Sequence, residues 1–219
     1  MAGDVVDLPA DAIEDAVGVL GRAFAHDPMY GAYFPDPARR TAGIDALNRA
    51  VLRMAHGHGE VRVAGGGRGV AVWMRPGAPV APWPMLRAGV LGVPKAAGWA
   101  TFLRFVGMDA GVEALRRRHV PGPCRHLLIL AVEPDSQRSG LGSALIADGR
   151  ARAEREGSPI WLETSVEANV GYYRRHGFDV TGEGTLGRSG TRFWGMLHPG
   201  SGHGADPPIG GARRDAGAV

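Results

Sequence analysis

The spacing of apolar residues changes several times along the chain, and each change predicts a different element. Apolar residues recur every three or four positions over 11–24, as on one face of an amphipathic helix. Helical spacing returns over 37–56, and Gly57 and Gly59 are expected to end the helix. Short strands are predicted at 60–64 and 69–74, because a run of three glycines separates them as in a β-hairpin.

The second half of the chain has the clearer pattern. Residues 127–132 are apolar without interruption, as expected for a central strand that is buried on both faces. A helix is predicted over 141–156 and another strand over 160–164, so the order strand–helix–strand predicts a parallel crossover. The remaining elements are a short helix and a closing pair of strands, at 169–176, 178–180 and 191–196. Together they predict a mixed α/β sheet.

Length and composition limit the classes of protein that the chain can represent. The 219 residues are 44% hydrophobic and 21% charged, which is typical of a globular chain rather than a disordered one. The single cysteine, Cys124, excludes a disulfide framework and any multi-cysteine metal site, and no metal is expected. Residues 1–198 are expected to form one domain, and the segment 199–219, rich in Gly, Pro and Ala, is predicted to be a flexible tail.

The charge pattern bears on location and on partners. The first segment is acidic and lacks the pattern of a signal peptide, and the longest apolar-rich stretch contains Pro94 and Lys95 in its middle. The formal net charge is +3, with basic residues scattered among acids rather than gathered in the dense stripe that nucleic acid requires. We therefore expect a cytoplasmic protein, monomeric or homodimeric, without a membrane or nucleic-acid partner.

The strongest chemical signal is the loop between the strand at 127–132 and the helix at 141–156. Two glycines, Gly140 and Gly142, stand where the loop becomes helix, and the free N–H groups of the first helical turn favour an anion such as a pyrophosphate. A dinucleotide loop would need a third glycine where Leu145 stands, and a nucleoside-triphosphate loop would need Gly-Lys-Ser/Thr. The remaining interpretation is a Gln/Arg-x-x-Gly-x-Gly/Ala loop that holds the pyrophosphate of coenzyme A.

These features resemble the GCN5-related N-acetyltransferase (GNAT) family over most of residues 1–198, most densely in 127–180. The loop matches the cofactor loop of that family, and Asn169 and Tyr173 match its Asn…Tyr-x-x-x-Gly-Phe segment. The resemblance implies the GNAT fold, a mixed, mostly antiparallel sheet with a splayed parallel strand pair and helices on both faces. Further similarity to the puromycin N-acetyltransferase-like members lies in three segments, at 70–73, 162–165 and 194–196.

The resemblance also implies acetyl-CoA as cosubstrate and a set of residue roles. Val132 would donate its backbone N–H to the thioester oxygen, and Tyr173 would protonate the departing sulfur. Asn169, four residues before Tyr173 and therefore on the same helical face, would bond the pantetheine amides. The cofactor-binding residues implied are Leu130, Ala131, Val132, Gln137, Arg138, Ser139, Gly140, Leu141, Gly142, Ser143, Asn169 and Tyr173.

The base that frees the acceptor amine stays open between three carboxylates. An alkyl ammonium has a pKa near ~10, so its proton must leave before attack. Glu163 is the first candidate, at the end of the strand that faces the splayed one. Glu133 is the second, and Asp27 is the third, as a charge that orients the acceptor. An ion pair between Glu163 and an arginine such as Arg174 fits the sequence equally well.

The expected function is acetyl-CoA-dependent N-acetylation of a primary amine on a small molecule, with an aminonucleoside or another antibiotic-like amine among the candidates. Direct attack in a ternary complex is favoured, since no Ser or Cys nucleophile constellation is visible. Residues 27–58 and 79–122 are expected to shape the acceptor pocket. Transfer to a hydroxyl or a peptide N-terminus, and a coenzyme A-binding module without turnover, stay open as alternatives.

Overall fold

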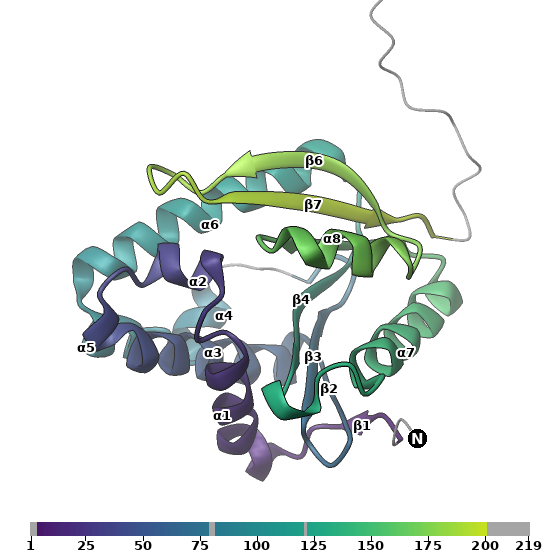
Figure 1. Ribbon diagram of the computed structural model, residues 1–219, viewed down its shortest axis with the longest axis horizontal. Helices are drawn as coiled ribbons and strands as arrows, with labels where there is room; N and C mark the ends of the chain where they lie inside the picture. Colours follow the sequence, from purple (N-terminus) through teal and green to yellow (C-terminus); the bar gives the residue numbers. More distant parts are fainter. Residues whose placement is uncertain (1–3, 79–81, 121, 201–219) are drawn as a thin grey trace, which may run out of the picture.

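The computed structural model describes residues 4–78, 82–120 and 122–200 (Figure 1). Within these ranges seven strands form one sheet in the order β1-β2-β3-β4-β5-β7-β6. Every neighbouring pair is antiparallel except β4 and β5, which are parallel, as the sequence predicted. The strands are β1 Val6–Asp7, β2 Gly59–Ala64, β3 Gly69–Met74, β4 Arg125–Val132, β5 Ile160–Thr164, β6 Asp179–Thr185 and β7 Arg192–His198.

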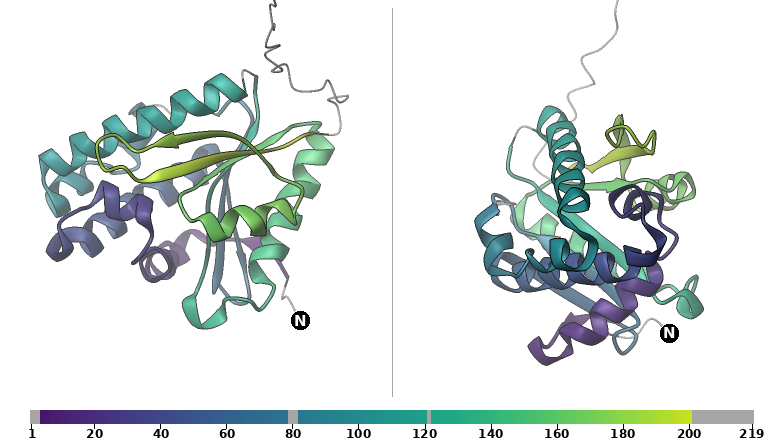
Figure 2. Two further views of the ribbon diagram at one scale, coloured as in Figure 1. Left: turned by 45° about the horizontal axis from the view of Figure 1, so that its top comes forward. Right: turned by 90° about the vertical axis from the view of Figure 1, so that its left-hand side faces the viewer.

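Helices cover both faces of the sheet, and a hydrophobic core lies under each layer (Figures 1 and 2). One face packs against α1, α3 and α6, with α5 packed on α3 and α6, and the other face packs against α7 and α8. None of the helices in the described ranges combines the length and apolar character needed to cross a membrane. The helices are α1 Ile13–Ala23, α2 Pro28–Tyr33, α3 Pro37–His58, α4 Pro82–Arg87, α5 Gly92–Ala97, α6 Trp99–His119, α7 Leu141–Glu156 and α8 Glu167–Arg174, with short 3-10 turns η1 Ala10–Ala12 and η2 Pro134–Ser136.

Several predicted boundaries need correction. The helix predicted over 11–24 begins at Ile13, after the 3-10 turn η1. Gly57 does not end α3, which continues to His58 and is capped at Gly59, because Gly57 makes no close contact and is tolerated within the last turn. The predicted tail at 199–219 lies outside the described residues except for its first two positions.

β4 carries one extra residue at its middle. Trp73 pairs with Leu127 and Val72 pairs with Ile129, so Leu128 forms a β-bulge. The bulge reverses which residues face which helices. Leu127 belongs to the core under α7 and α8, whereas Ile129, two positions on, belongs to the opposite core.

The bulge coincides with the place where β4 and β5 separate. Their parallel pairing ends at the pair Leu127↔Leu162. Beyond it β4 runs on to Val132 and β5 to Thr164, with no ladder between them in the described part of the chain. A bulge bends its strand and disrupts local pairing. The two strands therefore diverge, and this is the splayed pair that the GNAT resemblance implies.

The closed end of the opening between β4 and β5 is fixed by Arg125, whose side chain is wholly buried. Its guanidinium donates to Glu60 of β2 at 2.9 Å and to Glu156 of α7. Its backbone N–H donates to the carbonyl of Pro159 at 2.9 Å and to the hydroxyl of Ser158 at 3.1 Å. One residue thus ties β2, β4, α7 and the segment that enters β5 into one corner.

Candidate active site

The loop between β4 and α7 turns its backbone N–H groups outward. Gly140 caps α7 with a φ of 90°, and Arg138 has a φ of 61°, so both lie in the left-handed region. Among the described residues, the N–H groups of 138–143 donate to no protein acceptor. They stand at the N-terminus of a helix of 16 residues, whose dipole is positive at this end. Together they form a site for an anion with several oxygens.

Side chains of the loop brace it from within. The Nε2 of Gln137 donates to the carbonyl of Val132 at 3.4 Å, and the hydroxyl of Ser139 donates to the carbonyl of Ser136 at 2.6 Å. These bonds hold the loop in place while leaving its amides unpaired. The side chains of Gln137 and Ser139, which the sequence selected as cofactor-binding residues, therefore support the loop, and its backbone N–H groups face outward.

The second glycine of the loop has a different role from the first. A Cβ on Gly142 would lie 2.8 Å from the hydroxyl of Tyr172 on α8, whereas a Cβ on Gly140 would meet nothing within 4 Å. The Tyr172 hydroxyl also lies 3.4 Å from the Ser143 hydroxyl, which is 3.1 Å from Nε2 of His176. Tyr172 and His176, which sequence reasoning did not select, therefore stand beside the first turn of α7.

The edge of β4 that faces the opening supplies a second set of backbone groups. The N–H of Glu133 donates to the carbonyl of Arg68 on the β3 side at 2.8 Å. Because backbone groups alternate in direction along an antiparallel pair, the N–H groups of Leu130 and Val132 point away from β3, into the opening. Ala131, between them, points its N–H toward β3. Two of the three predicted strand residues thus offer free donors there.

α8 places two adjacent tyrosines in different surroundings. Tyr173 is 7% exposed, and its ring packs edge-on against Phe178 and against Tyr172. Burial raises the pKa of Tyr173, and nearby Tyr172 and Asp27 act in the same direction, so the phenol keeps its proton. Its hydroxyl makes no hydrogen bond within the described residues. Asn169, one turn earlier, donates from Nδ2 to the Thr164 hydroxyl at 3.5 Å.

Asp27 is a helix cap that joins α2 to the end of β5. One oxygen of its carboxylate accepts from the N–H groups of Met29 at 2.8 Å and Tyr30 at 3.1 Å, and the Ser165 hydroxyl donates to it at 3.4 Å. Burial raises the pKa of Asp27. Sequence reasoning considered Asp27 as a charge that orients the acceptor, and did not use it as a helix cap. It missed α2, although Asp at the cap and Pro at the first position is a helix-start signal.

Glu163 is held by two donors on the face of the sheet that α6 covers. Its Oε2 lies 2.7 Å from Nε2 of His126, and its Oε1 accepts from Nε1 of Trp161. Its side chain is only 9% exposed. The pairing with Arg174 that the sequence allowed is wrong, because Arg174 lines a groove between α8 and the β6–β7 hairpin.

Glu133, the second carboxylate considered as a base, lies at the surface. It accepts two hydrogen bonds from Arg22 of α1, at 2.7 and 2.9 Å. These bonds lower the pKa of Glu133. A carboxylate with a lowered pKa is a weaker proton acceptor, which disfavours Glu133 in that role.

α6 adds a carboxylate that sequence reasoning did not select. Asp109 is half-buried and has no hydrogen bond or ion pair within the described residues. Burial raises the pKa of Asp109 to about 6, the charge of Glu163 acts in the same direction, and His126 opposes it. No local motif marks Asp109, because the residues around it come from distant parts of the chain.

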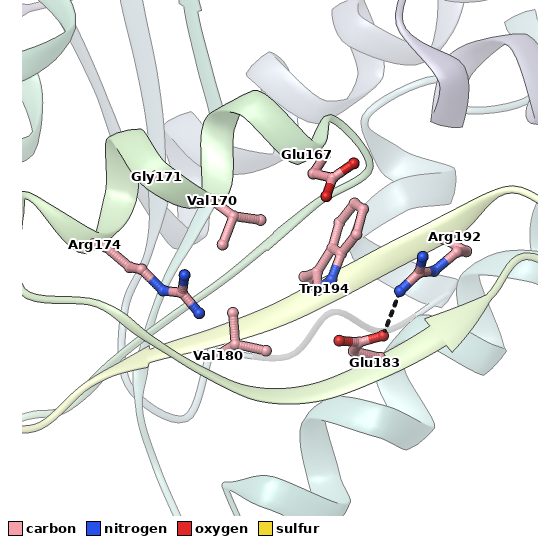
Figure 3. A pocket seen from close by; sticks show the side chains of 8 residues that line it. All are labelled: Glu167, Val170, Gly171, Arg174, Val180, Glu183, Arg192 and Trp194. Atoms are coloured by element: carbon pink, nitrogen blue, oxygen red, sulfur yellow. Dashed lines mark hydrogen bonds and ion pairs between the residues drawn. The ribbon is translucent and has the colours of Figure 1, made fainter.

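A groove of about 360 Å³ lies along the other side of α8, against the β6–β7 hairpin (Figure 3). Arg192 donates to Glu183 at 2.8 Å in this groove and lies over the ring of Trp194. None of its lining residues belongs to β4, to the loop 138–143 or to α6. The lining residues are Glu167, Val170, Gly171, Arg174, Val180, Glu183, Arg192 and Trp194.

Comparison with known proteins shows which class the chain is similar to. Residues 100–180 match the family model described as the acetyltransferase (GNAT) domain. A solved structure from Corynebacterium glutamicum, described as histone acetyltransferase HPA2 and related acetyltransferase, is 26% identical; the match covers 95% of this chain and 100% of that one, with a TM-score of 0.69. Residues 100–180 are therefore similar to a GNAT acetyltransferase domain, and the chain has the GNAT fold, which supports acetyl transfer in general.

Two further solved structures are similar in fold. Arylalkylamine N-acetyltransferase 2 from Aedes aegypti is 13% identical, with 89% of this chain and 97% of that one covered and a TM-score of 0.55. The ribosomal-protein-S18-alanine N-acetyltransferase from Escherichia coli is 17% identical, with 95% and 100% covered and a TM-score of 0.50. At these identities the similarity concerns the fold alone.

Proposed function

We propose that the protein is an acetyl-CoA-dependent N-acetyltransferase that acetylates a primary amine of a small molecule by direct attack in a ternary complex. One observation carries the proposal. The opening between β4 and β5 has unpaired backbone N–H groups along its β4 edge and at the start of α7, and the buried phenol of Tyr173 belongs to α8, the helix that packs on β5.

The residues present fit coenzyme A in two respects. The unpaired N–H groups of 138–143 match the oxygens of a pyrophosphate, and the positive end of the α7 dipole favours its charge. The N–H groups of Leu130 and Val132 match the carbonyl acceptors of a pantetheine arm that runs along β4. Bound there, acetyl-CoA supplies an activated acetyl group as a thioester.

The protein's own groups supply the remaining steps. An N–H at Leu130 or Val132 can donate to the thioester oxygen as negative charge grows on it. Tyr173, neutral at physiological pH, can give its proton to the sulfur that leaves. A carboxylate on the α6 side must take a proton from the acceptor before the nitrogen attacks.

An amine acceptor is favoured by the charge on the acceptor side. Asp27, Asp109 and Glu163 place three carboxyl groups on or near this side of the opening, and negative groups attract an ammonium. Two similar structures belong to proteins described as N-acetyltransferases of an arylalkylamine and of a ribosomal-protein alanine. The finer expectation of an aminonucleoside or antibiotic-like amine rests on the puromycin-type segments in the sequence.

The neighbouring tyrosines provide a matched test. Tyr173→Phe should lower kcat about 100-fold with little change in the KM for acetyl-CoA, because it removes only the proton donor. Tyr172→Phe should keep kcat and raise the KM for acetyl-CoA a few-fold, since its hydroxyl lies beside Gly142 and Ser143. Thiol release and product mass, measured against a panel of amines, alcohols and peptides, would give both values.

Two outcomes would contradict the proposal. Tight acetyl-CoA binding without acetylation of any amine, with residual turnover indifferent to Tyr173→Phe, would favour a coenzyme A-binding module. Acetylated alcohols or peptides in place of small amines would move the acceptor to one of the other two classes.

A further inference from the structure

We propose that Asp109 of α6 is the general base of the transfer, and that Glu163 is a positioning residue held by His126 and Trp161. This inference rests on the proposed function and deepens it by naming the group that takes the proton of the amine. It reverses the order expected from the sequence, in which Glu163 stands first and Asp109 has no role.

The contacts of Glu163 argue against a role in direct proton transfer. Both of its carboxylate oxygens already accept or share a hydrogen bond, one with His126 at 2.7 Å and one with Trp161. Its side chain is nearly buried, so it cannot turn toward an acceptor without giving up both bonds. Glu163 is therefore a fixed charge in the wall of the site.

The contacts of Asp109 leave it available. Neither of its oxygens has a hydrogen-bond or ion-pair partner in the part of the chain that the structure describes, and the residue is only half-buried. A carboxylate that is partly buried without a partner is costly to maintain, and such groups are concentrated at functional sites.

The packing of α6 places Asp109 on the acceptor side of the opening. Phe105, four residues earlier, packs edge-to-face on Tyr33 of α2, with ring centroids 5.1 Å apart. Arg116, seven residues later, lies 3.5 Å from the sulfur of Cys124, immediately before β4. Positions spaced by four and seven share one helical face, so Asp109 faces the region between α2 and the start of β4.

The charged groups around Asp109 set its proton affinity. Glu163 of β5 and Glu113 of α6 raise the pKa of Asp109, and His126 of β4 lowers it. Glu113 is itself paired with Arg116 and Arg117, each at 2.7 Å. On α2, Tyr33 is buried, and the charges of Asp109 and Glu163 help to raise its pKa, so it is uncharged.

The result is a base suited to neutral pH. Burial raises the pKa of Asp109 to about 6, and a general base is most effective when its pKa lies near the pH of the reaction. Desolvation of a bound ammonium beside Asp109 lowers its pKa from the value near ~10, which opposes the rise in pKa that the neighbouring carboxylates cause.

The protons of the reaction balance with one base and one acid. The acceptor ammonium gives its first proton to the Asp109 carboxylate, and the neutral nitrogen forms the C–N bond. As the C–S bond breaks, Tyr173 gives its proton to the sulfur, and the second proton that leaves the nitrogen reprotonates Tyr173. Asp109 returns its proton to solvent, so one proton is released per turnover.

Profiles of kcat/KM against pH for the wild type, Asp109→Asn and Glu163→Gln test the assignment, with acetyl-CoA and one amine substrate. Asp109→Asn should lose about 100-fold at pH 7 and should lack the acidic limb near pH 6, because its amide cannot accept the proton. Glu163→Gln should stay within about tenfold of wild type and shift its acidic limb to lower pH by up to about one unit, since the charge that raises the pKa of Asp109 is gone. Asp109→Glu should restore part of the rate and the limb.

The opposite pattern would overturn the proposal. If Glu163→Gln abolished turnover and Asp109→Asn kept the wild-type profile, Glu163 would be the base. Thermal melts of each variant show whether a loss comes from unfolding, and Asp109→Glu provides a second readout at the same position. A wild-type protein that acetylates no amine would overturn the proposed function and this assignment together, whereas an active wild type with an unaffected Asp109→Asn would overturn the assignment alone.

Discussion

The two sides of the opening between β4 and β5 are built from different parts of the chain. The α7 side consists of backbone N–H groups from the consecutive residues 138–143. The α6 side consists of side chains from separate elements, with Asp109, His126 and Glu163 as its polar groups. A polyanion can be held by one short loop at a helix end. A carboxylate accepts a proton near neutral pH only when its surroundings raise its pKa, and here those surroundings come from several elements.

The largest effect is expected at the corner that both sides share. Arg125→Ala removes the buried guanidinium that Glu60 and Glu156 share, while Glu60 keeps Arg75 and Arg152 nearby, so the free energy of unfolding should fall by about 2–4 kcal/mol. Urea denaturation measures it. In the surviving folded protein, acetyl-CoA affinity and the KM for the amine should worsen together. The matched control is Arg22→Ala, which removes an exposed pair with Glu133 and should leave stability unchanged. Similar stability of the two variants would show that the corner is not a common support.

A smaller effect separates the two sides by pH. The pKa of the Asp109 carboxyl is about 6 in the folded protein against 3.8 in the unfolded chain, so the folded state binds its proton more tightly and stability falls as pH rises between these values. Asp109→Asn removes that penalty. The variant should be more stable than wild type by about 1–3 kcal/mol at pH 7.5 and equal to it near pH 3.5. Chemical denaturation at the two pH values measures the difference, and an equal stability at pH 7.5 would contradict the raised pKa.

The smallest effect concerns the amide side alone. Gly140→Ala places a side chain at a φ of 90°, which costs about 1–2 kcal/mol and should weaken acetyl-CoA binding about tenfold. The KM for the amine should not change. Gly107→Ala, at an open position of α6, is the control and should leave the affinity intact. Calorimetric titration with acetyl-CoA decides between them, and an unaltered affinity in Gly140→Ala would remove the loop from the cofactor site.

The fold could be predicted largely because its signals are local. The hairpin at 60–64 and 69–74, the strand at 127–132 and the helix at 141–156 are confirmed to within a few residues. The strand predicted at 178–180 was too short, because the glycines of β6 interrupt the apolar pattern from which strands are predicted. The strand runs to Thr185. A Cβ on Gly182 would meet His119 at 2.6 Å, so that glycine serves packing that no sequence pattern reveals.

The candidate site also has one part that could be predicted from the sequence and one part that could not. The loop and Tyr173 were found from the sequence because a few adjacent residues carry the pattern, and their roles stay predictions. Glu163 was selected, but its bond to His126, 37 positions earlier, was not. Asp109 had no signal at all, since its raised pKa comes from burial and from a charge on another element.

The extra residue at Leu128 interrupts the regular pairing of β4, and this interruption lies where the opening for the proposed chemistry begins. Removing one residue there would exchange inward for outward at each of the next four positions, because side chains alternate along a strand. Without the bulge, β4 could pair with β5 along the full length of β5. The shortened protein would have more hydrogen bonds within its sheet, but it would lack the opening between β4 and β5.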